Sequence, residues 1–397
     1  MKVKKIKFSD HKVLGDLEVD FCDETGKPLN TIVVIGDNGA GKTTLLKAIF
    51  YMLNNNLNHR HGETVLNIEI NKGEEELISG PLFASDMIRD WQEIKRKHYL
   101  FDELNTKSNV APKVIFMPTE INFNDLHNVD YSFRLQESFI NVVDQKFIKD
   151  IPSLIANRIQ REILINDELP AKDSIKKVCN EINSIFSSMD LEVKLIGLSK
   201  DENSNPTFED RSGNQINIDS LSSGEKQLFL RALSLKFLNA NNSIILIDEP
   251  EISLHPQWQQ KIIDVYEGIG ENNQLIIATH SPHVIGNIEA KQLKVMKRDK
   301  DKVYIVDTKM LEETYGHPIE SILRTTMNLE SVRNADITDK LKKINDLLNK
   351  DLYDSDEFIK TYKYLNKYLG NLDKDIMLLN LEVSRRRGVK KNNVKGK

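Results

Sequence analysis

The chain has 397 residues, a length that predicts two to three domains of about 150 residues each. Hydrophobic residues make up 39% of the chain and the mean hydropathy is −0.43, values that predict an ordinary soluble globular protein. Acidic residues outnumber basic residues by 60 to 55, giving a formal charge of −5, which excludes a histone-like protein coated with positive charge.

The cysteine count and the hydropathy profile exclude further classes of protein. Only Cys22 and Cys179 occur, far apart, so neither a disulfide framework nor a four-cysteine zinc site is available. The first ten residues lack the apolar core of a signal peptide, and no run approaches 18 apolar residues. We therefore expect a reduced, cytoplasmic protein with no membrane partner.

In chain order, short continuous apolar runs predict strands that are buried on both faces. These runs are residues 31–35, 113–118, 243–248 and 274–279. Residues 43–53 have helical spacing, about 124–190 read as largely helical with a strand at 191–198, and the chain beyond about 310 is helical and charged. The predicted organisation is an α/β head formed by 1–53 and 216–310 with the strand 113–118, a largely helical insertion at 54–215, and a helical C-terminal extension with a basic tail at 311–397.

The first motif with chemical meaning is GDNGAGKT at residues 36–43, which matches G-x-x-x-x-G-K-[ST]. In such a loop the backbone N–H groups point at phosphate oxygens, the lysine reaches the β- and γ-phosphates, and the following hydroxyl binds Mg²⁺. A strand precedes the motif and a helix follows it, as this mechanism requires, whereas a chance glycine-rich turn would not need either. The predicted ATP-binding residues are Gly36, Asn38, Gly39, Gly41, Lys42, Thr43 and Thr44.

The second motif is an apolar run that ends in Asp248 and Glu249. Carboxylates at the C-terminal end of a parallel strand lie at the sheet edge where ligands bind. We predict that Asp248, with Thr43, holds Mg²⁺ and that Glu249 polarises the attacking water. An acidic strand end alone is usually a solvated turn; its pairing with the glycine-rich loop favours the catalytic interpretation.

The third and fourth motifs are LSSGEK at 221–226 and ATHSP at 278–282. Ser222 and Glu225 have the spacing of a capping box that opens a helix. With Gly224 they could also present a second phosphate-binding helix N-terminus, which would act across a dimer interface. His280 follows a buried strand and is predicted to lie beside the acids, where it could hydrogen-bond the γ-phosphate or the water; a lone histidine is more often structural.

Taken together, GDNGAGKT, LSSGEKQ, ILIDEPEISLHP and ATHSP resemble the ABC-class ATPase head, and most narrowly the branch that contains SMC, RecF and the overcoming-lysogenisation-defect nucleases. The resemblance implies an ABC-type P-loop head with a mixed sheet. It also implies Walker A at 36–44, a signature motif at 222–225, Walker B at Asp248 and Glu249, a D-loop at 253–255 and His280 as switch histidine. Glu120 stands roughly where a glutamine loop belongs, and His11 or Lys12 could pack against adenine.

Absent features narrow the resemblance. The chain has no C-x-x-C hook and no long heptad run, and about 90 helical, charged residues follow the head, so we do not expect a nuclease metal domain after it. The acid pair Asp354 and Asp356 reads as a helix-capping loop rather than a metal site. The layout resembles the PtuA-type ATPase subunits of Septu and retron anti-phage systems, in which a separate nuclease protein does the cutting.

The expected function is an ATPase subunit of a prokaryotic anti-phage complex, using ATP and Mg²⁺. We expect a head-to-tail homodimer or higher homo-oligomer that regulates a nuclease effector, with no nuclease activity of its own. One alternative is a RecF-like DNA repair ATPase that binds DNA without an effector, and a less favoured one is the soluble motor of a transporter. The basic stretch 383–397 is either a disordered solubilising tail or a contact for nucleic acid or an acidic partner.

Overall fold

In the computed structural model the described residues are 1–54, 63–70, 74–78, 112–119, 121–123, 126–136, 138–300, 302–306, 314–325, 327 and 331–395. The chain forms two compact units, Met1–Ile322 and Leu323–Lys397. The first unit therefore extends slightly beyond the predicted end of the head at residue 310.

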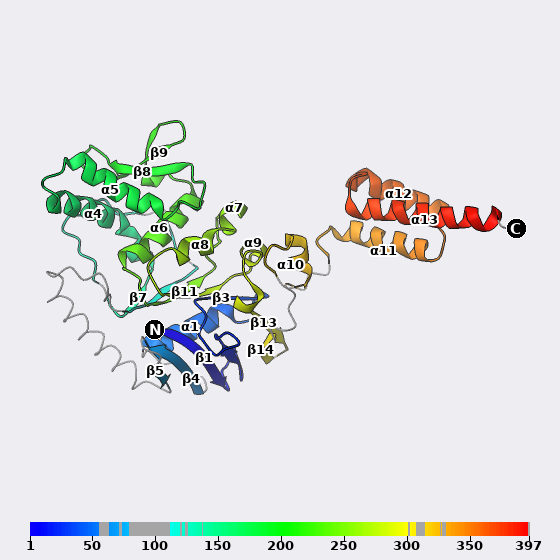
Figure 1. The fold of residues 1–397 in the computed structure, drawn as a ribbon, viewed down its shortest axis with the longest axis horizontal. Coiled ribbons are helices and arrows are strands. Elements are labelled where there is room, and N and C mark those ends of the chain that lie inside the picture. The colour runs from blue at the N-terminus through cyan, green and yellow to red at the C-terminus, as the bar shows by residue number, and fades with distance from the viewer. Residues whose placement is uncertain are drawn as a thin grey trace. The chain divides into compact units, whose positions relative to one another are not determined.

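A seven-stranded sheet runs through the first unit (Figure 1). Every strand is parallel to its neighbours except the edge strand β14, which pairs antiparallel with β13. This is the mixed sheet expected for an ABC-type P-loop head. In spatial order the strands are β14 (Lys302–Val306), β13 (Leu293–Asp299), β3 (Thr31–Gly36), β12 (Gln274–Ala278), β11 (Ile244–Asp248), β6 (Val114–Met117) and β7 (Ile140–Val142).

Helix α1 (Lys42–Asn54) packs on one face of this sheet and directly follows β3 through the glycine-rich loop. Its buried side chains, including Leu45 and Ile49, share one core with alternate residues of the central strands, such as Ile276. Side chains on a strand alternate between faces, so the intervening residues, such as Ile277, belong to the opposite face. Burial on both faces explains why these strands are continuous apolar runs in the sequence.

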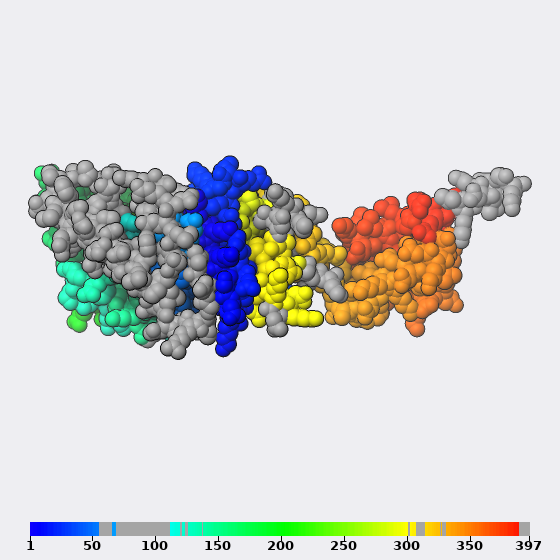
Figure 2. All heavy atoms as spheres, turned by 90° about the horizontal axis from the view of Figure 1, so that it is seen from below, coloured from blue at the N-terminus to red at the C-terminus, as the bar shows by residue number. Residues whose placement is uncertain are grey.

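An antiparallel sheet at the N-terminus covers the other side of α1. Its spatial order is β2 (Glu18–Asp20), β1 (Lys2–Ser9), β4 (Glu63–Ile70) and β5 (Glu74–Ile78). Buried residues of β1 and β4 join the same core as α1. Figure 2 shows the N-terminal residues, in blue, against the yellow residues around β13 and β14, where the Arg298 Nη2 donates to the Val13 carbonyl oxygen at 2.8 Å.

This pairing differs from the predicted boundary at residue 54. Strands β4 and β5 lie within the segment 54–215 that the sequence predicted as a largely helical insertion, yet they extend the sheet of β1. Strand β5 begins with three consecutive glutamates, and Asn67 and Glu69 interrupt the apolar residues of β4, so neither is a continuous apolar run like those by which the central strands were predicted.

Residues 145–217 form a helical layer on a small antiparallel sheet of order β10–β9–β8. The helices α5 and α4 pack on each other, α5 also contacts β8, and α3 and α4 contact α6. The elements are α3 (Gln145–Lys149), α4 (Ile151–Ile165), α5 (Ala171–Ser184), β8 (Val193–Leu198), β9 (Pro206–Asp210), β10 (Gln215–Asn217) and the 3₁₀ turn η1 (Ile218–Ser220). The remaining helices of this unit are α6 (Ser223–Phe237), α7 (Pro256–Gln259), α8 (Ile262–Glu267), α9 (Pro282–Ile285) and the 3₁₀ turn η2 (Ala290–Gln292), while α10 (Ile319–Thr325) begins just before its end.

The second unit is a bundle of α11 (Ala335–Asn349), α12 (Asp356–Leu369) and α13 (Lys374–Lys395). Its core is formed by apolar residues from all three helices, among them Ile344, Phe358, Leu365 and Ile376. The basic stretch is part of α13 as far as residue 395. This part of it is helical and is not the disordered tail that was one of the two alternatives for 383–397. We find no helix among the described segments that combines the length and apolarity needed to cross a membrane.

Candidate nucleotide-binding site

The loop between β3 and α1 has the backbone geometry that phosphate binding requires. Gly36, Gly39 and Gly41 have φ values of +152°, +79° and +102°, which side chains rarely tolerate. A Cβ at Gly36 would also lie 2.2 Å from the carbonyl oxygen of Met296 on β13, so only glycine fits there. The loop ends at the first turn of α1, where unpaired N–H groups and the helix dipole favour an anion.

Lys42 is the first residue of α1 and is only 7% exposed. Its Nζ donates to the carbonyl oxygens of Gly36 at 2.8 Å and Asp37 at 3.2 Å, so the ammonium is folded over its own loop. Burial lowers the pKa of Lys42, while Glu249 and Asp248 oppose that shift. A phosphate in the loop would give this ammonium the counter-charge that the backbone carbonyls provide only in part.

The side chain of Thr43, the last residue of the glycine-rich phosphate loop 36–43 (the P-loop), contacts the side chain of Asp248. The Thr43 hydroxyl lies 2.9 and 3.1 Å from the two carboxylate oxygens of Asp248, which is 3% exposed at the end of β11. A hydroxyl and a carboxylate that converge next to a phosphate loop are oxygen donors of the kind Mg²⁺ prefers. The residues present therefore fit a magnesium ion, and the two that the sequence assigned to it are adjacent in the fold.

Glu249 and His280 form the second pair at the same sheet edge. The strands β11 and β12 are adjacent and parallel, with Asp248 opposite Ala278, so the residues that follow them emerge side by side. His280 Nδ1 lies 3.0 Å from Glu249 Oε1. Glu249 has a φ of +46°, a left-handed conformation that is uncommon for a residue with a side chain.

A third carboxylate, that of Glu251, is hydrogen-bonded to the segment that carries His280. It is 5% exposed, and its Oε1 accepts hydrogen bonds from the Thr279 hydroxyl and from the backbone N–H of His280 at 3.2 Å. Its other oxygen is buried without a hydrogen-bond partner, and burial raises the pKa of the carboxyl group. No role was predicted for Glu251, although it stands in the motif ILIDEPEISLHP two residues after Glu249.

The signature segment forms the capping box that its spacing predicted. The Ser222 hydroxyl accepts from the Glu225 N–H at 3.3 Å, and the Glu225 carboxylate accepts from the Ser222 N–H at 2.9 Å. A Cβ at Gly224 would lie 2.8 Å from the carbonyl oxygen of Ser253, so the helix start is packed against the predicted D-loop. Within the described residues, no hydrogen bond joins Ser222, Gly224 or Glu225 to the P-loop of the same chain.

The P-loop opens onto a cavity of about 290 Å³. Asn38, Gly39, Gly41, Lys42, Thr43 and Thr44 line it together with Glu249, and Val13 and Arg298 complete it. Val13 comes from the loop after β1, next to the predicted adenine contacts His11 and Lys12, whereas Arg298 comes from β13, a strand for which no role at the site was predicted. An arginine beside a phosphate loop adds a second cation for a polyphosphate.

Arg231 connects α6, the helix that begins at the signature motif 222–225 and that we call the signature helix, to the core strands. It has no exposed surface, although it lies on α6 two turns beyond the capping box. Its Nη2 donates to the carbonyl oxygens of Pro118 at 2.9 Å and Thr119 at 3.3 Å, and its Nη1 lies 3.4 Å from that of Asp248. The signature helix is thus bonded to the ends of β6 and β11.

The remaining predictions have different outcomes. Glu120, the glutamine-loop candidate, lies outside the described residues. His11 Nδ1 accepts from the backbone N–H groups of Val13 and Leu14, so this ring shapes the loop beside the cavity. Asp354 pairs with Arg387 at 2.7 Å. The described segments contain no group of three or more His, Cys, Asp and Glu side chains that could hold a metal ion.

Comparison with protein families finds one model, described as an AAA domain, putative AbiEii toxin, Type IV TA system, that matches residues 71–286. Among curated proteins, the chain is 23% identical to a Vibrio cholerae protein named Retron Vc95 probable ATPase, over 75% of this chain and 73% of that protein. It is 25% identical to a Bacillus thuringiensis protein named Septu protein PtuA, over 84% of this chain and 85% of the relative. It is also 29% identical to a Rad50 double-strand break repair ATPase from Saccharolobus solfataricus, over 27% of this chain and 14% of that protein.

Among solved structures, the chain is similar to an Smc head bound to the C-terminal winged-helix domain of ScpA and to an SMC head domain from Thermotoga maritima. The TM-scores are 0.44 and 0.39, each at 14% identity and each over 77% of this chain and 98% of the other.

Proposed function

Because the chain belongs to the family of AAA domains described as putative AbiEii toxins of type IV toxin–antitoxin systems, we propose that it is the ATP-hydrolysing subunit of a prokaryotic anti-phage defence complex. The similarity to proteins named as Septu and retron ATPases, over most of the chain and most of each relative, supports the defence role. The convergence of the P-loop, Thr43, Asp248, Glu249 and His280 at one sheet edge is the observation that carries the ATPase activity.

In this proposal the loop amides and the Lys42 ammonium hold the β- and γ-phosphates of ATP. Thr43 and Asp248 would hold Mg²⁺, which supplies charge neutralisation on the β- and γ-phosphate oxygens. Glu249 accepts a proton from a water molecule as the water oxygen attacks the γ-phosphorus and the bond to the ADP oxygen breaks. His280 donates from Nδ1 to the Glu249 carboxylate, which orients that group, and its Nε2 is left to hydrogen-bond the attacking water.

We further propose that two chains associate head to tail, with the signature segment of one completing the site of the other. Ser222 and Ser223 are exposed at the N-terminus of α6, a 15-residue helix, and in the described part of the chain no hydrogen bond joins the capping box to the P-loop. A capped but exposed helix N-terminus that is not bonded to the phosphate site of its own chain is suited to a phosphate held by a second chain. ATP-dependent closure would then regulate a separate nuclease effector.

A complementation experiment tests the head-to-tail arrangement. Lys42→Ala removes the phosphate-binding lysine, and Ser222→Arg blocks the signature surface, so either homodimer has two defective sites. A mixed dimer places both changes in one site and leaves the other intact. We expect the mixture to recover ATP hydrolysis that neither variant has alone, and a single chain with both changes to give no recovery when mixed with itself. Failure of the mixture to recover activity would remove the signature segment from the site.

The effector is tested by purification with the product of the adjacent gene. We expect a nuclease that elutes together with this chain, and no cleavage of DNA or RNA by the isolated chain with Mg²⁺ or Mn²⁺. Nucleic-acid cleavage by the isolated chain, lost on Asp354→Ala but retained on Lys42→Ala, would contradict the proposal.

A further inference from the structure

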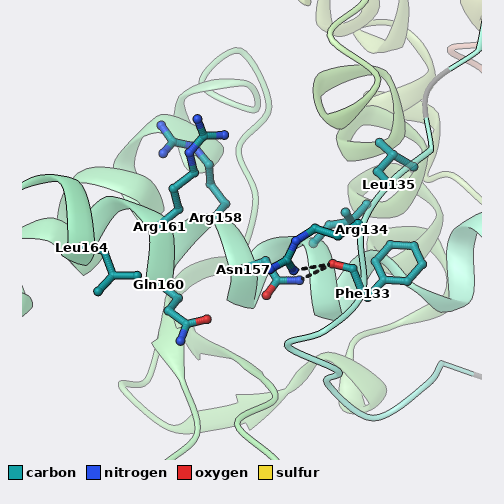
Figure 3. A pocket seen from close by; sticks show the side chains of 9 residues that line it. Phe133, Arg134, Leu135, Asn157, Arg158, Gln160, Arg161 and Leu164 are labelled. Atoms are coloured by element: carbon teal, nitrogen blue, oxygen red, sulfur yellow. Dashed lines mark hydrogen bonds between the residues drawn. The ribbon is translucent and has the colours of Figure 1, made fainter. Parts of the chain in front are cut away.

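A second groove, of about 460 Å³, lies beside α4, far along the chain from the P-loop (Figure 3). It is formed by the segment 133–135 on one side and by α4 residues between 154 and 164 on the other. None of its lining residues lines the nucleotide cavity. We call it the α4 groove.

The extended wall of the α4 groove is fixed to the helix by hydrogen bonds. The Asn157 side chain donates to the carbonyl oxygen of Phe133 at 3.1 Å, and the Asp130 N–H donates to the Ser153 hydroxyl at 2.9 Å. Arg134 Nη1 also donates to the Phe133 carbonyl oxygen, at 2.9 Å. These hydrogen bonds hold the wall of the groove in place before any ligand binds. Binding would therefore not carry the entropic cost of ordering that segment.

The α4 groove combines an apolar lining with three guanidinium groups. Its apolar residues are Phe133, Leu135, Leu154 and Leu164, and its cations are Arg134, Arg158 and Arg161. Figure 3 shows Arg158 and Arg161 extending side by side from α4, with Arg134 on the opposite wall. The chain as a whole carries a formal charge of −5, so three arginines in one groove are a local departure from its overall balance.

Arg134 and Arg161 have guanidinium N–H groups left for a ligand, whereas Arg158 is occupied by two glutamates. Arg158 is paired with Glu162 at 2.7 Å and Glu181 at 3.2 Å. Arg134 uses Nη1 for backbone carbonyls, which leaves its Nε–Nη2 edge, and the exposed Arg161 has no ion pair in the described part of the chain. Glu162 and Glu181 are also bonded to Lys177 and Lys236, so the local carboxylates are already satisfied.

We propose that the α4 groove docks an acidic segment of a partner polypeptide, with an apolar side chain of that segment seated on the leucine-lined floor. Carboxylates of the segment pair with Arg134 and Arg161, whose planar forks match a carboxylate with two parallel hydrogen bonds. This inference rests on the proposed function, because it assigns the place where the effector or another subunit of the defence complex binds.

The surroundings of the groove favour a polypeptide over a nucleic acid. Beyond Leu164, which is 72% exposed, Ile165 and Leu169 continue the apolar surface at the end of α4. Exposed apolar residues next to arginines are typical of protein interfaces. A nucleic-acid backbone instead requires cations at successive phosphates, and here Arg158, Lys177 and Lys236 are engaged by Glu162 and Glu181.

The experiment uses the full chain and a fluorescent peptide that alternates glutamate with leucine or phenylalanine. A peptide with glutamine in place of glutamate and a single-stranded DNA of similar length serve as comparison probes. We expect saturable binding of the acidic peptide, weakened about tenfold by Arg161→Glu. Lys200→Glu, which makes the same charge change at an exposed site outside the groove, should leave the affinity unchanged.

A gain of affinity separates a direct contact from misfolding. Gln160 lines the groove and is exposed, so Gln160→Lys should tighten binding of the acidic peptide and not of the glutamine peptide. Equal binding of the two peptides, no binding below about 1 mM, or tighter binding of DNA that depends on Arg161 would each overturn the proposal. ATP hydrolysis, measured on the same samples, should be unchanged by these variants; a chain that binds the peptide but does not hydrolyse ATP would contradict the proposed ATPase and leave the groove assignment standing.

Discussion

Glu249 and His280 are 31 residues apart in the chain, yet their side chains lie 3.0 Å apart at the carboxyl ends of two adjacent parallel strands. The backbone N–H of His280 donates to the Glu251 carboxylate. The position of the imidazole is therefore fixed both through the main chain of His280 and through the contact of its ring with Glu249. The pair is therefore held on both sides, and each member can be tested separately.

Removing the carboxylate of Glu249 should stop the chemical step without stopping nucleotide binding. Glu249→Gln keeps the shape of the side chain and loses the proton acceptor, so we expect kcat to fall at least about 100-fold, as is typical for general bases. His280→Ala should lower kcat less, because the base remains. Phosphate release under saturating ATP and equilibrium binding of ATP together measure the two effects. A Glu249→Gln variant with native kcat would exclude Glu249 as the base.

Lys42 should determine affinity for ATP, and a second lysine on the same helix provides the control. Lys42 is buried and folded over the P-loop, whereas Lys47 is exposed one turn further along α1. Lys42→Ala should abolish ATP binding measurable by isothermal titration, since the β- and γ-phosphate charge is left uncompensated. Lys47→Ala should bind as the native chain does. Native affinity in the Lys42 variant would refute the assignment of the phosphate loop.

Local motifs allowed much of the fold to be predicted. The P-loop, the buried strands and the capping box each depend on residues within a few positions of one another, and the structure has strands at 31–36, 244–248 and 274–278 where the apolar runs predicted them. The stretch HPQWQQKIIDVYEGI at 255–269, which reads as one helix between two buried strands, is instead divided into α7 and α8. The Asn287 side chain donates to the Gln260 carbonyl oxygen between them, a partner 27 residues away that no helical periodicity could indicate.

The parts that the sequence did not predict depend on distant pairing. Arg298 reaches the nucleotide cavity because β13 pairs with β3, and a single sequence shows no link between those strands. Glu251 and Arg231 are charged residues, which are mostly exposed in proteins, and only the structure shows that both are buried next to the acids of β11. The place of β4 and β5 in the N-terminal sheet was not predicted either, because it depends on the pairing of β4 with the distant strand β1.

Arg231 should be a major contributor to stability. Its guanidinium is fully buried and donates to carbonyl oxygens at the ends of β6 and β11. Arg231→Met keeps most of the volume but leaves these oxygens without donors, so we expect a loss of about 2–5 kcal/mol in the free energy of unfolding. Lys236→Met removes a half-exposed cation from the same helix and should cost less than about 1 kcal/mol. Urea denaturation of both variants measures the difference, and equal effects would show that burial of Arg231 has no special role.

The buried carboxylate of Glu162 should make the first unit sensitive to acid. Hydrogen bonds from Lys177 and Arg158 lower its pKa from the ordinary value of 4.5 to about 2. A carboxylate with a lowered pKa in the folded state contributes stability that is complete above 4.5 and is lost as pH falls towards 2, because the unfolded chain takes up the proton first. We therefore expect the free energy of unfolding of the native chain to drop between pH 5 and pH 3. Glu162→Gln should be less stable at neutral pH and should show a smaller drop over that interval, since it has no proton to bind. Glu168→Gln, an exposed position beyond the end of the same helix, should follow the native curve. Denaturant unfolding of the three proteins at each pH tests this, and a Glu162→Gln curve parallel to the native one would show that the ion pairs of Glu162 do not stabilise the fold.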